Sequence, residues 1–176
     1  MSHFASPRAA LVCLDLQRNR QSSEAQGPVA SQCRRVLAEA RRRRWPVLHV
    51  HARTQADARP IAGLEPRPNE PVFLRQGPSA FSNANFTRAA LALGGPLALI
   101  GFALEDTVLA TAFAAADRDI AVDVILDAVF TGTHEPEAVD RVLLAPLHAL
   151  APRARLVTSD DLLVADTGRF AAANLP

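Results

Sequence analysis

The residue types best placed for chemistry are a carboxylate and a glycine, each of which follows a buried strand. Asp15 comes directly after the apolar run at residues 9–14, and a polar, turn-rich segment follows it. Gly101 comes directly after the apolar run at residues 97–100. Continuous apolar runs of this length are typical of strands that are buried on both faces of a parallel sheet. The carboxylate of Asp15 can hold neighbouring backbone N–H groups, or it can serve a ligand site, and we favour the ligand site.

A strand, a turn, a helix and a second strand follow one another directly in residues 97–133. Residues 122–126 form the second strand, with Asp123 and Asp127 at its start and its end. The apolar positions of the helix recur at the spacing i, i+3, i+4 of a helix that lies on a sheet: Val108, Leu109, Ala112, Phe113 and Ala116. A helix that joins two parallel strands makes a right-handed crossover. We therefore interpret this stretch as a βαβ unit.

The remaining sequence predicts further strands at residues 47–50, 72–74 and 155–157. Further helices are predicted from Pro28 to the basic run 41–44, at 86–93, at 136–150, and at 159–163, where Ser159 or Asp160 caps the helix. Six short strands that alternate with helices predict a doubly wound α/β fold. We expect a six-stranded parallel sheet of order 3-2-1-4-5-6 with helices on both faces, in three α/β/α layers. We expect residues 1–176 to form a single domain.

In this strand order the first and fourth strands are neighbours at the topological switch point. Asp15 and the turn after Ile100 then open into one crevice at the carboxyl ends of the strands, where ligands bind in doubly wound folds. Arg75 follows the third strand and is either a member of this site or a solvated surface charge. Thr107 lies at a helix start, where a threonine commonly caps the helix. The sequence therefore predicts a ligand site at this crevice.

Composition excludes several classes of function. The chain has 176 residues, and with 49% of them hydrophobic it can form a core. Its net charge of +1 gives no electrostatic field that would attract nucleic acid or an anionic membrane. With 5% aromatic residues and no Tyr it has little for base stacking, so we expect no nucleic-acid partner. We interpret the arginine run 41–44 as a solvated helix end. The apolar runs are strand-sized and no signal-peptide pattern begins the sequence, so we expect no membrane contact and a cytoplasmic location.

Cysteine and histidine give no pattern of a metal centre or a disulfide framework. Cys13 lies in a predicted strand and Cys33 in a predicted helix, and we interpret both as core-filling thiols. His49 and His51 face one side of a strand, but no third ligand with suitable spacing accompanies them. We therefore expect no metal and no cofactor. The chain contains no Lys, because all 19 of the residues counted as Lys or Arg are Arg.

Four segments resemble the isochorismatase-like superfamily, the cysteine-hydrolase fold shared by isochorismatases, nicotinamidases and N-carbamoyl amidohydrolases. They span most of the chain: ALVCLDLQ, VFLRQGPSAF, LALIGFALEDTVLATAFAAADRDIAVDVILDA and RARLVTSDDLL. The catalytic set of that family is an Asp, a Lys and a Cys. The resemblance places Asp15 at the Asp position, Arg75 at the Lys position and Thr107 at the Cys position. It therefore implies a degenerate triad, with these three residues as the catalytic candidates.

The two replacements change the chemistry that such a triad can perform. A cysteine near a helix N-terminus and a cation can have its pKa lowered from about 8.5 into the neutral range, whereas a threonine hydroxyl needs a dedicated base. An arginine does not release its proton, but its planar guanidinium can hold a carboxylate with two hydrogen bonds. We therefore expect a site built from Asp15, Arg75 and Thr107 to bind anions well and to transfer acyl groups poorly.

The resemblance also implies substrate-binding residues and an assembly state. Gln17 follows the catalytic-Asp strand, Phe81 belongs to a Ser-Ala-Phe segment that lines the pocket, and Phe102 and Ala103 precede the nucleophile position. The peptide bond between Phe102 and Ala103 is expected to be cis, as in family members. Ordinary packing under a loop is the alternative for Phe81. Members commonly form homo-oligomers, and residues 52–63 do not reproduce the metal-binding Asp and His set of nicotinamidases.

Two functions of different classes follow. The first is an isochorismatase-type hydrolase that acts on or binds a small anionic organic molecule without a cysteine nucleophile. In it, Asp15 protonates a vinyl ether while Arg75 holds a substrate carboxylate. A neighbouring Arg favours the ionised form of an Asp, so this acid role requires an opposing influence. The second is a non-catalytic family member that keeps the fold as a ligand-binding or oligomeric assembly protein.

Overall fold

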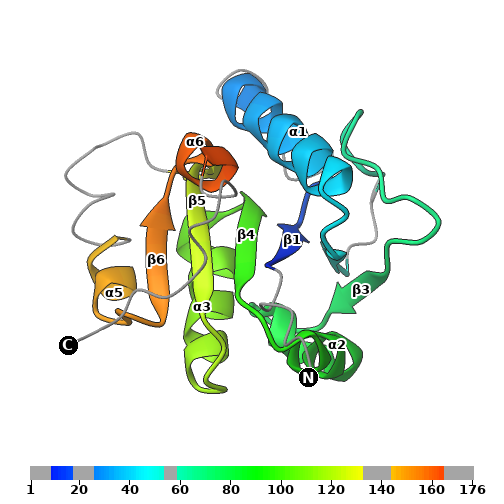
Figure 1. Ribbon diagram of the computed structural model, residues 1–176. Helices are drawn as coiled ribbons and strands as arrows, with labels where there is room; N and C mark the ends of the chain where they lie inside the picture. Colours follow the sequence, from blue (N-terminus) through cyan, green and yellow to red (C-terminus); the bar gives the residue numbers. More distant parts are fainter. Residues whose placement is uncertain (1–8, 18–25, 54–58, 133–143, 165–176) are drawn as a thin grey trace, which may run out of the picture.

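The computed structural model describes residues 9–17, 26–53, 59–132 and 144–164 (Figure 1). Within these residues, six strands form one sheet of order β3-β2-β1-β4-β5-β6, and each neighbouring pair is parallel. The strands are β1 (Ala10–Leu14), β2 (Val47–Ala52), β3 (Val72–Arg75), β4 (Leu97–Phe102), β5 (Val122–Phe130) and β6 (Ala154–Val157). The predicted fold class and strand order are confirmed.

The central strands are continuous apolar runs because helices cover both faces of the sheet. One apolar cluster packs between the sheet and α2 (Ala84–Leu93), α3 (Leu109–Ala116) and α5 (Ala145–His148). The other packs between the sheet and α1 (Gln26–Arg42) and α6 (Ser159–Val164). Each large apolar side chain that is fully buried in these clusters contributes about 1.5–3 kcal/mol. The result is the predicted three-layer arrangement (Figure 1).

The centre of the sheet brings the two predicted parts of the site together. β1 and β4 are neighbours, with Leu14 opposite Gly101, so the segments that follow them lie at the same edge. β5 is longer than predicted and continues to Phe130, past a shift in its register with β4. Asp127 therefore lies within β5 and not at its end.

Two helices differ from the prediction in their bounds. α1 begins at Gln26, so Pro28 lies in its first turn, where a missing N–H is tolerated. The helix expected at residues 136–150 falls partly outside the described residues, and its described part is α5. No helix in the described part of the chain is long and apolar enough to cross a membrane.

The amino terminus of α6 is capped by a different residue from the ones predicted. Asp161 N donates to Thr158 Oγ1 at 3.2 Å, and Thr158 N donates to Asp161 Oδ2 at 3.0 Å, which makes a reciprocal cap. Ser159 is engaged elsewhere, because its Oγ donates to Asp127 Oδ2 at 2.5 Å. The expectation that Ser159 or Asp160 caps this helix is therefore wrong.

Candidate active site

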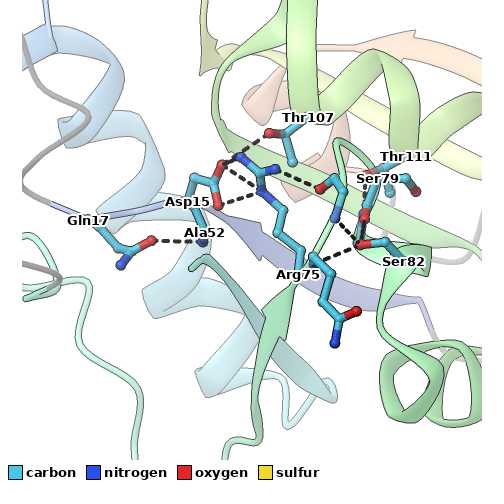
Figure 2. Close-up of polar contacts among 11 residues, drawn as sticks. Asp15, Gln17, Ala52, Arg75, Ser79, Ser82, Thr107 and Thr111 are labelled. Carbon is cyan, nitrogen blue, oxygen red and sulfur yellow. Dashed lines mark hydrogen bonds and ion pairs between the residues drawn. The ribbon is translucent and has the colours of Figure 1, made fainter. Parts of the chain in front are cut away.

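The candidate site begins at the residue that follows β1. Asp15 has a positive φ of 49°, a left-handed conformation that costs a non-glycine residue about 1–2 kcal/mol. Its N–H donates to Val50 O at 2.8 Å, which extends the pairing of β1 with β2. Its side chain is fully buried and meets side chains from β3 and from the segment after β4 (Figure 2).

A glycine allows β4 to lie against β1 at this point. Gly101 has a φ of +123°, and a Cβ added there would lie 1.9 Å from Leu14 O. No side chain fits in that space, and the conformation itself is one that favours glycine. The residue after β1 and the turn after β4 are therefore held side by side.

Arg75, the last residue of β3, points at Asp15 (Figure 2). Its Nε donates to Oδ1 and Oδ2, at 3.1 Å each, and its Nη2 donates to Oδ2 at 2.7 Å. Its Nη1 donates to Gly77 O at 2.7 Å, which holds the guanidinium from another side. The Arg75 side chain is only 11% exposed, so the alternative of a solvated surface charge is wrong. The expected pairing of Arg75 with Asp15 is confirmed.

Thr107 approaches the same carboxylate from the segment after β4. Leu104–Val108 is a π-helical turn, in which Val108 N donates to Ala103 O at 3.1 Å. Thr107 is fully buried, and its Oγ1 donates to Asp15 Oδ2 at 3.0 Å (Figure 2). The interpretation of Thr107 as a helix cap is therefore wrong, since its hydroxyl binds the carboxylate. All three catalytic candidates meet at one buried carboxylate.

Phe102 and Ala103, which follow one another at the end of β4, were predicted to contact the ligand. The Phe102–Ala103 peptide bond is cis, as expected. The Phe102 side chain is 1% exposed, and its ring lies 5.3 Å from that of Phe130, centroid to centroid. The Phe102 ring therefore belongs to the apolar core, and Ala103 is half-buried beside it.

Gln17 and Phe81, both predicted to bind substrate, make contacts within the fold, and their binding role stays a prediction. The Gln17 Oε1 accepts from Ala52 N at 2.9 Å and links the ends of β1 and β2 (Figure 2). The Phe81 ring packs edge-on against Phe86 at 5.1 Å, and the Arg118 guanidinium lies over it at 5.0 Å. The structure thus shows Phe81 packed under the loop after β3, and its role as a pocket wall stays a prediction.

Ser82, a serine for which the sequence predicted no role, shapes the loop after Arg75. Ser82 Oγ accepts from Gln76 N at 3.0 Å and from Gly77 N at 2.9 Å. These bonds fix the turn whose Gly77 carbonyl accepts from Arg75 (Figure 2). A serine after a strand has many possible partners, so the sequence held no specific signal for this role.

A second threonine of the same helical segment was also missed. Thr111 Oγ1 accepts from Ala80 N at 3.0 Å and ties the loop after β3 to α3 (Figure 2). Thr111 is four residues after Thr107, and side chains at that spacing share one face of a helix. This spacing was the available signal, because a buried polar pair on an otherwise apolar helix needs partners.

The two thiols do not take part in this site. Burial raises the pKa of the Cys13 thiol well above its ordinary value and raises that of Cys33 to about 12. Cys33 Sγ donates to Ala128 O at 3.1 Å, on the α1 side of the sheet. The prediction that both cysteines fill the core is confirmed. Among the described residues, no group of three or more His, Cys, Asp or Glu side chains could hold a metal ion.

Comparison with known sequences gives one family. The sequence model of the Isochorismatase domain matches residues 9–148, a range that contains Asp15, Arg75 and Thr107. Among curated proteins, no sequence matches the chain.

Solved structures share the fold at low sequence identity. The MAR1 ribonuclease of Caenorhabditis elegans is 20% identical, with a TM-score of 0.79 over 96% of this chain and 88% of that one. An isochorismatase of Pseudomonas putida is 22% identical, with a TM-score of 0.75 over 87% and 89%. An isochorismatase family protein of Desulfovibrio vulgaris is 22% identical, with a TM-score of 0.75 over 90% and 98%. At these identities the likeness shows the fold alone.

Proposed function

The chain belongs to the isochorismatase family, and from that premise we propose that it hydrolyses a vinyl ether of a small organic anion without a cysteine nucleophile. The observation that carries the proposal is the buried Asp15 carboxylate, which accepts hydrogen bonds from Arg75 and Thr107. A buried carboxylate beside a guanidinium suits proton transfer to an anionic substrate. The two thiols are buried away from this carboxylate and do not supply a nucleophile.

Arg75 selects for an anion. Its bonds to Asp15 and Gly77 use the Nε–H and one N–H of each terminal nitrogen. A second N–H on each terminal nitrogen has no partner among the described residues, so the guanidinium can donate to a second carboxylate, that of a substrate. An arginine that bridges two carboxylates would hold the substrate beside Asp15.

A substrate anion also removes the obstacle to an acid role for Asp15. In the free protein Arg75 stabilises the Asp15 carboxylate directly. A second negative charge on the same guanidinium offsets that stabilisation, so in this proposal the charge of the substrate takes part in catalysis.

In the proposed reaction, Asp15 gives up one proton and regains one. Protonated Asp15 gives its proton to the terminal vinyl carbon, and the ether carbon becomes an oxocarbenium ion. Water adds to that carbon and returns a proton to Asp15, and the hemiketal breaks down to a ketone and an alcohol. Thr107 donates to Asp15 Oδ2 and so fixes the orientation of the carboxyl group. No covalent intermediate is required.

Acyl transfer from an amide is not expected of the same site. A Thr107 nucleophile would have to give its proton to Asp15, whose two carboxylate oxygens already accept hydrogen bonds from Arg75. We therefore expect no hydrolysis of nicotinamide or of an N-carbamoyl compound.

The proposal is tested by turnover of isochorismate and related enol-ether carboxylic acids. We expect release of the keto acid, with a decrease in kcat of about 10²–10⁴-fold in Asp15→Asn, the usual contribution of a general acid. Arg75→Lys keeps the charge but loses the planar fork, so its KM is expected to rise. Arg88→Lys, an exposed arginine of α2, serves as the matched control. Absence of turnover on every such acid would overturn the proposal.

One observation favours a second function, that of a non-catalytic ligand-binding member. Asp15 and Arg75 already satisfy each other in the free site, as they would in a site kept for binding. Calorimetry distinguishes the two functions. Binding of an enol-ether acid that needs Arg75 but leads to no product would identify a binding protein.

A further inference from the structure

A hollow lies at the opposite edge of the sheet from Asp15. It has a volume of about 430 Å³ and is lined by Pro46 and Val47, where β2 begins, and by the end of α1. Asp15 follows the last residue of β1, which is parallel to β2, so the two sites lie at opposite ends of the strands. Pockets that hold small molecules are commonly about 300–1,000 Å³. We refer to the hollow as the amino-edge cleft.

The cleft is rich in arginine, and the nearby carboxylates are already paired. Arg41 Nε and Nη2 donate to the two oxygens of Glu70 at 2.8 Å each. Arg42 and Arg43 both donate to Glu39. Arg41 is therefore part of a nearly buried ion pair, with side chains 14% and 6% exposed, which corrects the expectation that the run 41–44 is only a solvated helix end.

Two arginines of the cleft remain available. Arg44 and Arg67 both line it and are exposed, and within the described residues their guanidinium groups have no hydrogen bond or ion pair. Arg67 N donates to Glu70 Oε2 at 3.0 Å, so the backbone that carries Arg67 is anchored to the same ion pair. Asn69 also lines the cleft, and an asparagine side chain can donate through its amide group.

The backbone at the end of α1 fixes the position of Arg44. Arg44 has a positive φ of 57°, and Trp45 N donates to Ala40 O at 2.9 Å, as in a helix that ends in a left-handed residue. The turn brings Trp45 to the wall of the cleft, next to Arg44. The cleft thus combines two available guanidinium groups, an amide and an apolar wall.

We propose that the amino-edge cleft binds the phosphate group of a small phosphorylated molecule. Two guanidinium groups match the charge of a phosphate dianion and can donate to its three oxygens, whereas a single carboxylate would use only one of them. The Glu70 carboxylate does not oppose the anion strongly, because Arg41 neutralises it. The volume exceeds that of a phosphate ion, which leaves room for the organic part against Trp45.

Trp45 gives a direct readout, because it is the single Trp of the chain and lines the cleft. Inorganic phosphate is titrated at pH 7.5 at constant ionic strength set with chloride, and tryptophan emission is recorded alongside calorimetry. We expect a saturable signal in both, at least tenfold weaker in Arg44→Gln and in Arg67→Gln. Arg88→Gln, an exposed arginine of α2, is the matched control and is expected to bind as the native chain does.

The outcomes separate this cleft from the site of Asp15. Saturable binding that is lost in Arg75→Gln but kept in Arg44→Gln and Arg67→Gln would show that phosphate occupies the other site, and would overturn the proposal. The absence of calorimetric binding by the native chain would overturn it as well. Circular dichroism of each variant confirms that it is folded. The proposal stands independently of any hydrolase activity.

Discussion

At the scale of single residues, the site depends on how one buried carboxylate is satisfied. Asp15 accepts from a guanidinium on β3 and from a hydroxyl on the π-helical turn after β4, groups that are 60 and 92 residues away in sequence. A buried carboxylate without such partners would be strongly destabilising. A ligand that binds Arg75 or Thr107 would have to compete with these hydrogen bonds to Asp15.

The thiols yield a prediction at this scale. Because Cys13 and Cys33 are buried and burial raises both pKa values, iodoacetamide at pH 7.5 is expected to leave the native chain unmodified and its activity unchanged. Mass spectrometry should show two modified cysteines only after unfolding in urea. Rapid alkylation of either cysteine in the native protein, with loss of activity, would place the site elsewhere.

The sequence identified the carboxylate but not all of its surroundings. Asp15 could be predicted because it directly follows a buried strand, and ligands of doubly wound folds bind at the carboxyl ends of such strands. The partner of Thr107 could not, because the π-helical turn that directs its hydroxyl to Asp15 depends on packing after β4. Resemblance to the family brought Arg75 to the site, whereas local sequence left it equally consistent with a surface charge.

At the scale of elements, the close contact of β1 and β4 positions the site. The apolar runs predicted both strands, and the topology predicted that they are neighbours. The residue that caps α6, in contrast, could not be predicted from the local sequence. Thr158 and Ser159 are both suitable capping residues, and the choice depends on Asp127 of β5, a distant residue that accepts from Ser159.

Substitution of Gly101 tests the contact between the strands. In Gly101→Ala the new Cβ would meet Leu14 O at 1.9 Å in a backbone conformation with φ of +123°. Strain and overpacking together are expected to lower the free energy of unfolding by about 3 kcal/mol or more. Urea denaturation measures the change.

Gly94 is the matched control for that substitution. It also has a positive φ, of 64°, but a Cβ there would meet nothing within 4 Å. Gly94→Ala is therefore expected to cost about 1–2 kcal/mol, from the left-handed backbone alone. Equal effects of the two substitutions would contradict the close approach of β1 and β4.

At the scale of the whole molecule, the two edges of the parallel sheet carry different sets of charged residues. The carboxyl edge carries Asp15, and the amino edge carries the arginine-rich cleft. At the amino edge, Arg41 holds Glu70, and His49 Nε2 lies 2.9 Å from Glu70 Oε2. Buried ion pairs of this kind make the stability of the fold depend on pH.

We expect the free energy of unfolding to fall as the pH is lowered from 7 to 4. Burial lowers the pKa of His49, so below about pH 6.5 the unfolded chain takes up protons that the folded chain does not. Burial opposes the ionisation of Glu70, but hydrogen bonds from Arg41, Arg67 N and His49 lower its pKa to about 2. Below about pH 4.5 the unfolded chain also takes up a proton at Glu70 that the folded chain does not, so the free energy of unfolding falls further.

Urea denaturation at pH 7, 6, 5 and 4 measures this dependence. Glu70→Gln should be destabilised at pH 7 by about 3–5 kcal/mol, the cost of breaking a buried ion pair. It should also lose the part of the pH dependence below pH 4.5. A native chain that is equally stable at pH 7 and pH 5 would show that His49 is not held neutral by the fold.

The most direct test of the proposed reaction follows the proton that Asp15 transfers. Isochorismate is incubated with the protein in D2O, and the methyl group of the released keto acid is examined by NMR and mass spectrometry. We expect release well above the spontaneous rate, one deuteron in that methyl group, and a rate that falls about 10²–10⁴-fold in Asp15→Asn. A rate no higher than the spontaneous one, or an equal rate in Asp15→Asn, would contradict it.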